Sequence, residues 1–214
     1  MRWTLPNILT VSRICLTPVI ALLPFFLGYR PKLAAFAIFL AAAITDTIDG
    51  WLARRYQQVS ELGQFLDPIA DKLLLFATLV PIYWLTNRAG GVLDYSMPWW
   101  GGLPPWVVVV LVGREVLITA FRFFAKRRGV VIPAAGPGKL KATVQAVFIG
   151  SALAWFAWRD LEASFRIDPG FRAFWEQFHG AVMGGTLAAS VVLTIYSMVV
   201  YLYRYRGLLR NSGG

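Results

Sequence analysis

Long apolar runs are the feature that most constrains how this chain can fold. Six of them approach or exceed the roughly 20 residues that a helix needs to cross a bilayer. They cover about residues 8–28, 32–55, 67–86, 105–126, 139–158 and 180–203. Of the 214 residues, 57% are hydrophobic, and the mean hydropathy is +0.59. A soluble core of this size cannot bury so much apolar surface, so lipid must solvate part of the chain.

The fold class follows from how lipid treats the backbone. Since the bilayer core offers no water, only helices and closed barrels satisfy every backbone polar group there. The six runs lack the alternation of barrel strands. We therefore predict an all-α polytopic membrane protein with six transmembrane helices in a single membrane domain, residues 1–214. A short N-terminal interfacial segment is expected before the first span, and residues 159–178 are expected to form a polar, partly amphipathic extracytoplasmic connection.

The formal net charge of +10 is interpreted as a membrane feature rather than a nucleic-acid footprint. With six spans, both termini and the connections after the second and fourth spans share one face. That face carries eleven of the 21 Lys and Arg residues, the opposite face carries six, and four lie within spans. The richer face is expected to be cytoplasmic, in the cell membrane, with both termini on that side.

Four aspartates stand where an apolar run should exclude them. Asp46 and Asp49 are three residues apart, and Asp67 and Asp71 are four apart, so each pair shares a helix face. A short connection makes the two helices antiparallel neighbours, and all four carboxylates then meet near the cytoplasmic boundary. Either some of them are protonated or they bind cations. Oxygen ligands suit Mg²⁺ or Mn²⁺, and two such ions can clamp a phosphoryl-type displacement.

Two other interpretations of these residues stay open. The carboxylates can form a structural set paired to Arg54, Arg55 and Lys72, or line a divalent-cation transporter, where membrane carboxylates are also common. Gly50 and Ala53, on the same face as the first aspartate pair, leave room either for a ligand or for close helix packing. Gly63 is expected to permit a tight turn just before the third span.

The spacing of these residues resembles the complete signature of one enzyme family. The pattern Asp46-x2-Asp49-Gly50-x2-Ala53-Arg54-x8-Gly63-x3-Asp67-x3-Asp71 is similar to that of the CDP-alcohol phosphatidyltransferases. Softer similarities, in residues 6–13, 66–72, 113–115 and 138–145, favour the phosphatidylglycerophosphate synthase branch. Cardiolipin synthases and inositol-phosphate-using enzymes are the rivals within the family.

The resemblance implies an activity. The enzyme would depend on a divalent metal, Mg²⁺ or Mn²⁺, with two ions expected in the site. It would bind CDP-diacylglycerol. The hydroxyl of an acceptor, glycerol 3-phosphate in this branch, would attack the β-phosphorus and CMP would leave. Family members are commonly homodimers, so a homodimer is expected.

The resemblance also implies roles for individual residues. The metal ligands would be Asp46, Asp49, Asp67 and Asp71, and Asp71 is alternatively the general base. The residues against the CDP-lipid would be Gly50, Ala53, Arg54 and Gly63. The acceptor phosphate needs cations, for which the candidates are Arg114, Arg122, Lys139 and Lys141. Arg114 can equally pair with Glu115 or with another span.

Overall fold

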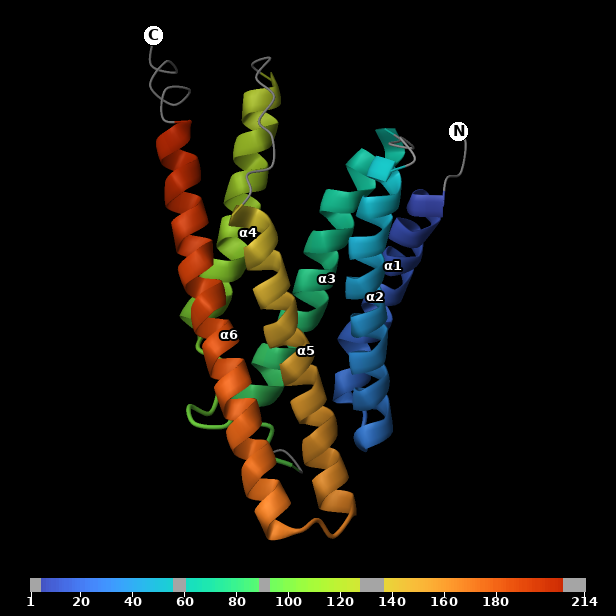
Figure 1. Cartoon of the computed structure of the whole chain (residues 1–214), viewed down its shortest axis with the longest axis vertical. Helices are drawn as coiled ribbons and strands as arrows, with labels where there is room; N and C mark the ends of the chain where they lie inside the picture. The colour runs from blue at the N-terminus through green and yellow to red at the C-terminus, as the bar shows by residue number, and fades with distance from the viewer. Residues whose placement is uncertain (1–4, 56–60, 89–92, 128–136, 206–214) are drawn as a thin grey trace. The chain divides into compact units, whose positions relative to one another are not determined.

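The computed structural model describes residues 5–55, 61–88, 93–127 and 137–205, and this part of the chain is built from helices (Figure 1). The elements are α1 (Leu5–Leu22), the 3-10 helix η1 (Leu23–Phe25), α2 (Tyr29–Arg55), α3 (Glu61–Asn87), α4 (Pro105–Arg127), α5 (Pro137–Ser164) and α6 (Pro169–Arg204). The described residues contain no β-strand beyond one isolated bridge between Met97 and Gly101.

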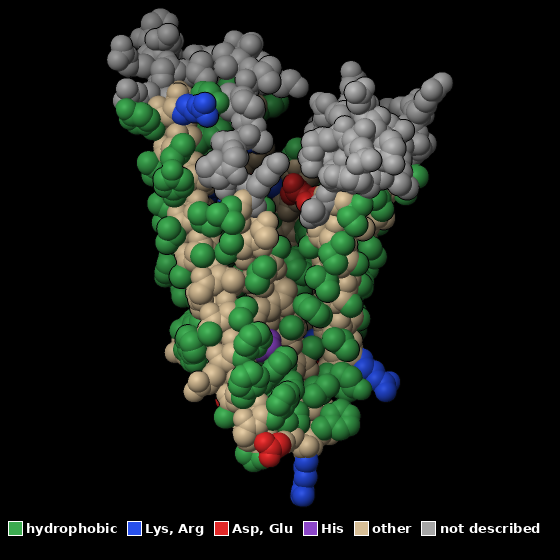
Figure 2. Space-filling model, viewed as in Figure 1, with side chains coloured by type: hydrophobic (Ala, Val, Ile, Leu, Met, Phe, Trp, Pro, Cys, Tyr) green, Lys and Arg blue, Asp and Glu red, His purple; other side chains and the backbone are tan. Residues whose placement is uncertain are grey.

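The helices confirm an all-α polytopic membrane protein. Four stretches are long and apolar enough to cross a bilayer: Asn7–Phe25, Leu66–Asn87, Leu140–Ser164 and Pro169–Arg204. Helices α2 and α4 coincide with the other two predicted spans, and both carry charged residues within them. Figure 2 shows hydrophobic side chains over the flanks of the helices on the visible face. Val80, Val109 and Val192 are exposed apolar side chains, as expected of a surface that faces lipid.

The last two helices are longer than the hydropathy pattern predicts. Most of residues 159–178, the expected connection, are helical, because α5 continues to Ser164 and α6 begins at Pro169. Proline suits the first position of a helix, and the Asp168 carboxylate accepts a hydrogen bond of 2.9 Å from the backbone N–H of Phe171, which caps α6. Arg172 pairs with Glu162 of α5 at 2.7 Å, which ties the two helix ends together.

The beginning of the chain also differs in detail from the expectation. From Leu5 onward the expected interfacial segment continues without a break into the first span as the helix α1, which ends at Leu22, and residues 1–4 lie outside the described part. By contrast, both aspartate pairs lie on helices as predicted, the first pair on α2 and the second on α3.

The chain divides into two compact units. The first comprises Met1–Leu103 and Ile149–Gly180, and the second comprises Pro104–Phe148 and Ala181–Gly214, so α5 and α6 contribute to both. Within the first unit, α1 packs against α2 and α3. Ile20, Ala35 and Ala70 are fully buried in this unit. The single domain expected from the sequence stays a prediction.

Candidate functional site

A stripe of buried polar residues lies on one side of α1, and two of them, Thr10 and Arg13, contact the predicted aspartates. The stripe consists of Asn7, Thr10, Arg13 and Thr17, all buried. Their spacings of three and four residues put them on one side of a helix whose other positions are mostly apolar. Arg13 is only 2% exposed. Because a cation in an apolar helix is costly, it requires acidic partners nearby.

Three of the predicted aspartates supply the partners. Arg13 Nη1 donates to Asp46 Oδ1 at 2.5 Å and to Asp71 Oδ1 at 3.3 Å. One turn earlier on α1, Thr10 Oγ1 donates to Asp67 Oδ1 at 2.8 Å. One helix thus gathers carboxylates from α2 and α3.

The carboxylates of Asp46, Asp67 and Asp71 contact α1 on one side and are exposed on the other. The side chains of Asp46 and Asp71 are 50% and 61% exposed, although the arginine between them is buried. Asp67 is exposed as well. The arrangement is therefore a layer of acidic oxygens that rests on a buried cation and is accessible from outside the helix packing.

The donor set suits a hard divalent cation, since all of its ligand atoms are carboxylate oxygens. Among the described side chains, no group of three carboxylates or other ligating residues lies close enough together to hold one ion. The side chain of Asp49, the fourth predicted ligand, lies outside the described part, as do those of Gly50, Ala53 and Arg54. The residues fit a divalent metal by chemistry, with Asp49 one turn from Asp46 on α2.

Two expectations about neighbouring residues change. Lys72 donates to the backbone carbonyl of Pro68 at 3.0 Å, so the cation that pairs with the aspartates in the described contacts is Arg13. Gly63 lies inside α3, which begins at Glu61, so the tight turn expected there is wrong. The helix starts earlier than the apolar run because polar residues continue its first turn.

A second charged cluster lies in the other unit, on α4 and α5. Arg114 Nη1 donates to Glu115 Oε1 at 2.9 Å, and the buried Lys141 Nζ donates to the same oxygen. The predicted acceptor-phosphate residues Arg114 and Lys141 therefore come together, around a glutamate. Arg122 lies elsewhere on α4, with its guanidinium carbon 5.9 Å from the centre of the Tyr201 ring. The side chain of Lys139 lies outside the described residues.

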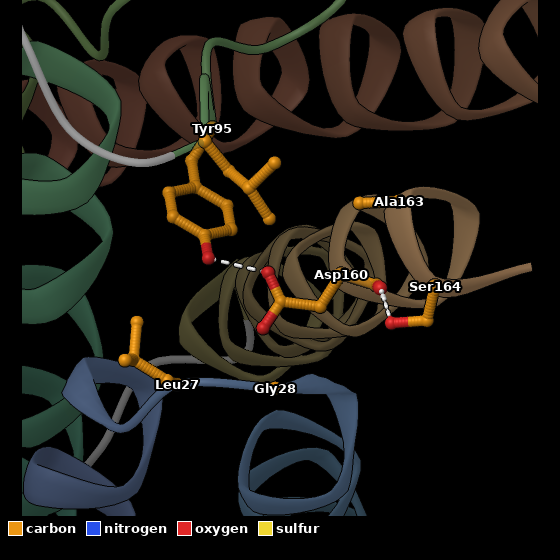
Figure 3. Close-up of a pocket in the computed structure, with 7 residues that line it drawn as sticks. Leu27, Gly28, Tyr95, Asp160, Ala163 and Ser164 are labelled. Carbon is orange, nitrogen blue, oxygen red and sulfur yellow. Dashed lines mark hydrogen bonds between the residues drawn. The ribbon is translucent and has the colours of Figure 1, made fainter.

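A third charged group lies in the first unit, near the start of α2. Figure 3 shows a small pocket in which the Tyr95 hydroxyl donates to Asp160 and the Ser164 hydroxyl donates to the Asp160 backbone carbonyl. Lys32 Nζ donates to the same aspartate at 2.7 Å, and both charged side chains are 2% exposed. Burial and then the bond to Asp160 raise the pKa of Tyr95, so this phenol stays a neutral donor. Because the charges of Lys32 and Asp160 are paired with each other, we interpret this group as one that stabilises the fold.

Sequence reasoning anticipated the pairing of Arg114 with Glu115, but it missed the contacts of Arg13 and Thr10 with the aspartates and the Lys32–Asp160 pair. Arg13 carried a usable signal, since it is charged inside an apolar run and shares a helix face with other polar residues. The partners were not predictable by spacing, because 33 and 58 residues separate Arg13 from Asp46 and Asp71.

Comparison with known proteins adds independent findings. The family model described as CDP-alcohol phosphatidyltransferase matches residues 3–196. A "CDP-diacylglycerol--glycerol-3-phosphate 3-phosphatidyltransferase" of Salmonella choleraesuis (strain SC-B67) is 34% identical over 219 residues, which cover 99% of this chain and 100% of that protein. The protein of the same name from Escherichia coli (strain K12) is 32% identical over 216 residues, with the same coverage.

A mycobacterial relative matches over a shorter stretch. A "Probable phosphatidylglycerophosphate synthase" of Mycobacterium tuberculosis (strain CDC 1551 / Oshkosh) is 43% identical over 149 residues. The match covers 68% of this chain and 64% of that protein. The aligned region thus spans about two thirds of each chain.

Proposed function

This chain belongs to the CDP-alcohol phosphatidyltransferase family, and we propose that it transfers the phosphatidyl group of CDP-diacylglycerol to glycerol 3-phosphate. The products are CMP and phosphatidylglycerophosphate. The observation that carries the proposal is the convergence of Asp46, Asp67 and Asp71 on Arg13 and Thr10, at the signature positions of the family. The names of the nearly full-length relatives support the choice of acceptor.

The four signature aspartates would bind the divalent metal for which the family is known. We expect this metal to be Mg²⁺ or Mn²⁺, with two ions in the site. The bound metal supplies positive charge to the pyrophosphate oxygens of the donor. Asp46, Asp49 and Asp67 would act as ligands. Gly50, Ala53, Arg54 and Gly63 are proposed to lie against the CDP-lipid, with the small residues leaving room for the ligand.

Asp71 is proposed as the general base, with metal ligation as its alternative role. Its exposed carboxylate would accept the proton of the acceptor hydroxyl. The acceptor oxygen then forms a bond to the β-phosphorus, the bond from that phosphorus to the bridging oxygen breaks, and CMP leaves with the electron pair. A base on α3 next to Asp67 can serve this step because the two side chains lie one turn apart.

A transfer assay tests the function. Purified protein in detergent receives CDP-diacylglycerol and Mg²⁺ or Mn²⁺, with glycerol 3-phosphate, inositol phosphate, serine or phosphatidylglycerol supplied in separate reactions. We expect metal-dependent CMP release with glycerol 3-phosphate only. Release with a different acceptor would keep the family chemistry and change the substrate, whereas no release from folded, metal-bound protein would favour divalent-cation transport.

The acceptor phosphate is proposed to bind the cluster of Arg114 and Lys141, with Arg122 and Lys139 as further candidates. Arg114→Gln or Lys141→Gln should raise the KM for glycerol 3-phosphate about 10- to 100-fold, since a hydrogen bond to a charged group contributes about 1.5–3 kcal/mol. Steady-state kinetics with each substrate varied in turn measure this effect.

Arg127→Gln is the matched control, because Arg127 is an exposed cation on the same helix that lies over the Phe123 ring. Its KM for glycerol 3-phosphate should stay near that of the unaltered protein. If the Arg114 and Lys141 variants instead raised only the KM for CDP-diacylglycerol, the two residues would belong to the donor site.

The location in the cell is also part of the proposal. The protein is a multi-pass membrane protein, and we place it in the cytoplasmic membrane with both termini and the active site at the cytoplasmic face. The asymmetry of Lys and Arg supports this orientation. The homodimer rests on the family resemblance alone, and a mass measurement in detergent tests it.

A further inference from the structure

We propose that Arg13 is a positioning residue that holds Asp46 and Asp71 together and competes with divalent metal for these carboxylates. The affinity for metal is then low until the CDP-lipid binds and adds its negative charge. The inference rests on the proposed function, because it takes these aspartates as metal ligands. Arg13 lies outside the family signature, on a different helix from any of its residues.

The geometry makes Arg13 a permanent neighbour of the aspartates. Its side chain is 2% exposed and belongs to the buried stripe of α1, which packs against α2 and α3. One nitrogen, Nη1, contacts both carboxylates. Helix packing fixes this guanidinium in place, so it cannot swing into solvent when a metal ion approaches.

The charge of Arg13 opposes metal binding. A guanidinium stays protonated at every accessible pH, so the positive charge is constant. A divalent ion at Asp46 and Asp71 meets this charge at close range, because Arg13 already contacts one oxygen, Oδ1, of each carboxylate. Without Arg13 the two carboxylates repel one another, and a metal ion relieves that repulsion.

The competition has a consequence for the order of binding. A pyrophosphate brings negative charge that offsets Arg13, so metal and the CDP moiety should bind cooperatively. Such coupling is reciprocal, since each ligand raises the affinity of the other by the same factor. Removing Arg13 should therefore tighten the metal site and reduce its dependence on the nucleotide.

A purely organising role for Arg13 predicts the opposite sign. If the arginine only arranges the carboxylates for the metal, its removal disorders them and weakens metal binding. The direction of the change in metal affinity therefore distinguishes the two roles, independently of catalysis.

The experiment measures Mn²⁺ binding to the purified full chain in detergent, by the electron paramagnetic resonance signal of free Mn²⁺, without substrate and then with CDP. The variants are Arg13→Gln, which removes the charge, and Arg13→Lys, which keeps it. Thr17→Val is the matched control, because Thr17 is buried on the same face of α1 and donates to the Arg13 backbone carbonyl at 2.8 Å.

We expect Arg13→Gln to lower the Kd for Mn²⁺ at least tenfold, with Arg13→Lys and Thr17→Val within threefold of the unaltered protein. CDP should lower the Kd in the unaltered protein and have a smaller effect in Arg13→Gln. An unchanged or higher Kd in Arg13→Gln overturns the proposal. So does the absence of Mn²⁺ binding in every protein.

Arg13→Met serves if the glutamine variant does not fold, because its unbranched apolar chain keeps the packing of the arginine stem. The same tighter binding is expected. If both variants fail to fold even with Mn²⁺ present, Arg13 is structural and the proposal is overturned. Failure of the proposed function would look different: CMP release would be absent from the unaltered protein, whatever its Mn²⁺ affinity.

Discussion

Replacing Asp71 by asparagine is expected to lower kcat about 10²- to 10⁴-fold, the range that a general base contributes. The amide has the shape of the carboxylate but cannot accept the proton of the acceptor hydroxyl. The fold should survive, because the side chain is 61% exposed. CMP release under saturating CDP-diacylglycerol, glycerol 3-phosphate and metal measures the effect.

Asp94→Asn is the matched control, since Asp94 is an exposed residue of the first unit whose carboxylate accepts hydrogen bonds from Ser96. Its kcat should stay close to that of the unaltered protein. Mn²⁺ affinity then separates the two roles left open for Asp71. A large loss of kcat with unchanged affinity identifies the base, and a parallel loss of affinity identifies a ligand. Near-normal turnover would exclude both.

The membrane class and the helical placement of the aspartates were predictable from local sequence. Apolar length and the exclusion of unpaired backbone groups from lipid decide the class, and the three- and four-residue spacings decide which aspartates share a face. The contact between Arg13 and those aspartates was not predictable in this way. It depends on how α1 packs against α2 and α3, which spacing within one helix does not specify.

The errors have a common physical origin. Hydropathy marks where a helix enters lipid, whereas a helix ends where its backbone hydrogen bonds and caps end. Residues 159–164 and 169–178 contain charged side chains and are still helical, because an aspartate cap and cross-helix pairs stabilise them outside the predicted apolar runs. Gly63 is a second case: it lies before the predicted apolar run, yet it is inside α3, which begins at Glu61.

In the described part of each unit, the charged side chains that meet between helices form groups of opposite sign. Arg13 meets two aspartates, Lys32 meets Asp160, and Glu115 meets a lysine and an arginine. The groups differ in exposure, and exposure separates their roles. The carboxylates on Arg13 are open on one side and can receive a ligand, whereas both partners of the Lys32–Asp160 pair are 2% exposed.

Lys32→Met is therefore expected to destabilise the protein by about 3–5 kcal/mol, because it leaves the Asp160 carboxylate buried without its cation. For a chain of this size that corresponds to a fall in Tm of roughly 6–20 °C. Thermal unfolding in a single detergent, followed by intrinsic tryptophan fluorescence, measures the shift. Initial transfer rates at low temperature should change little, since Lys32 and Asp46 are about 21 Å apart along α2.

The matched control is Arg30→Gln, which removes an exposed cation from the same turn of α2 and should leave the Tm nearly unchanged. The double variant Lys32→Met with Asp160→Asn should recover part of the loss. It removes the unpaired charge, and the asparagine side-chain oxygen can still accept the hydrogen bond from Tyr95. The second substitution relieves only the cost of the unpaired buried carboxylate. A double variant no more stable than Lys32→Met would therefore show that the lost stability comes from packing around the lysine side chain.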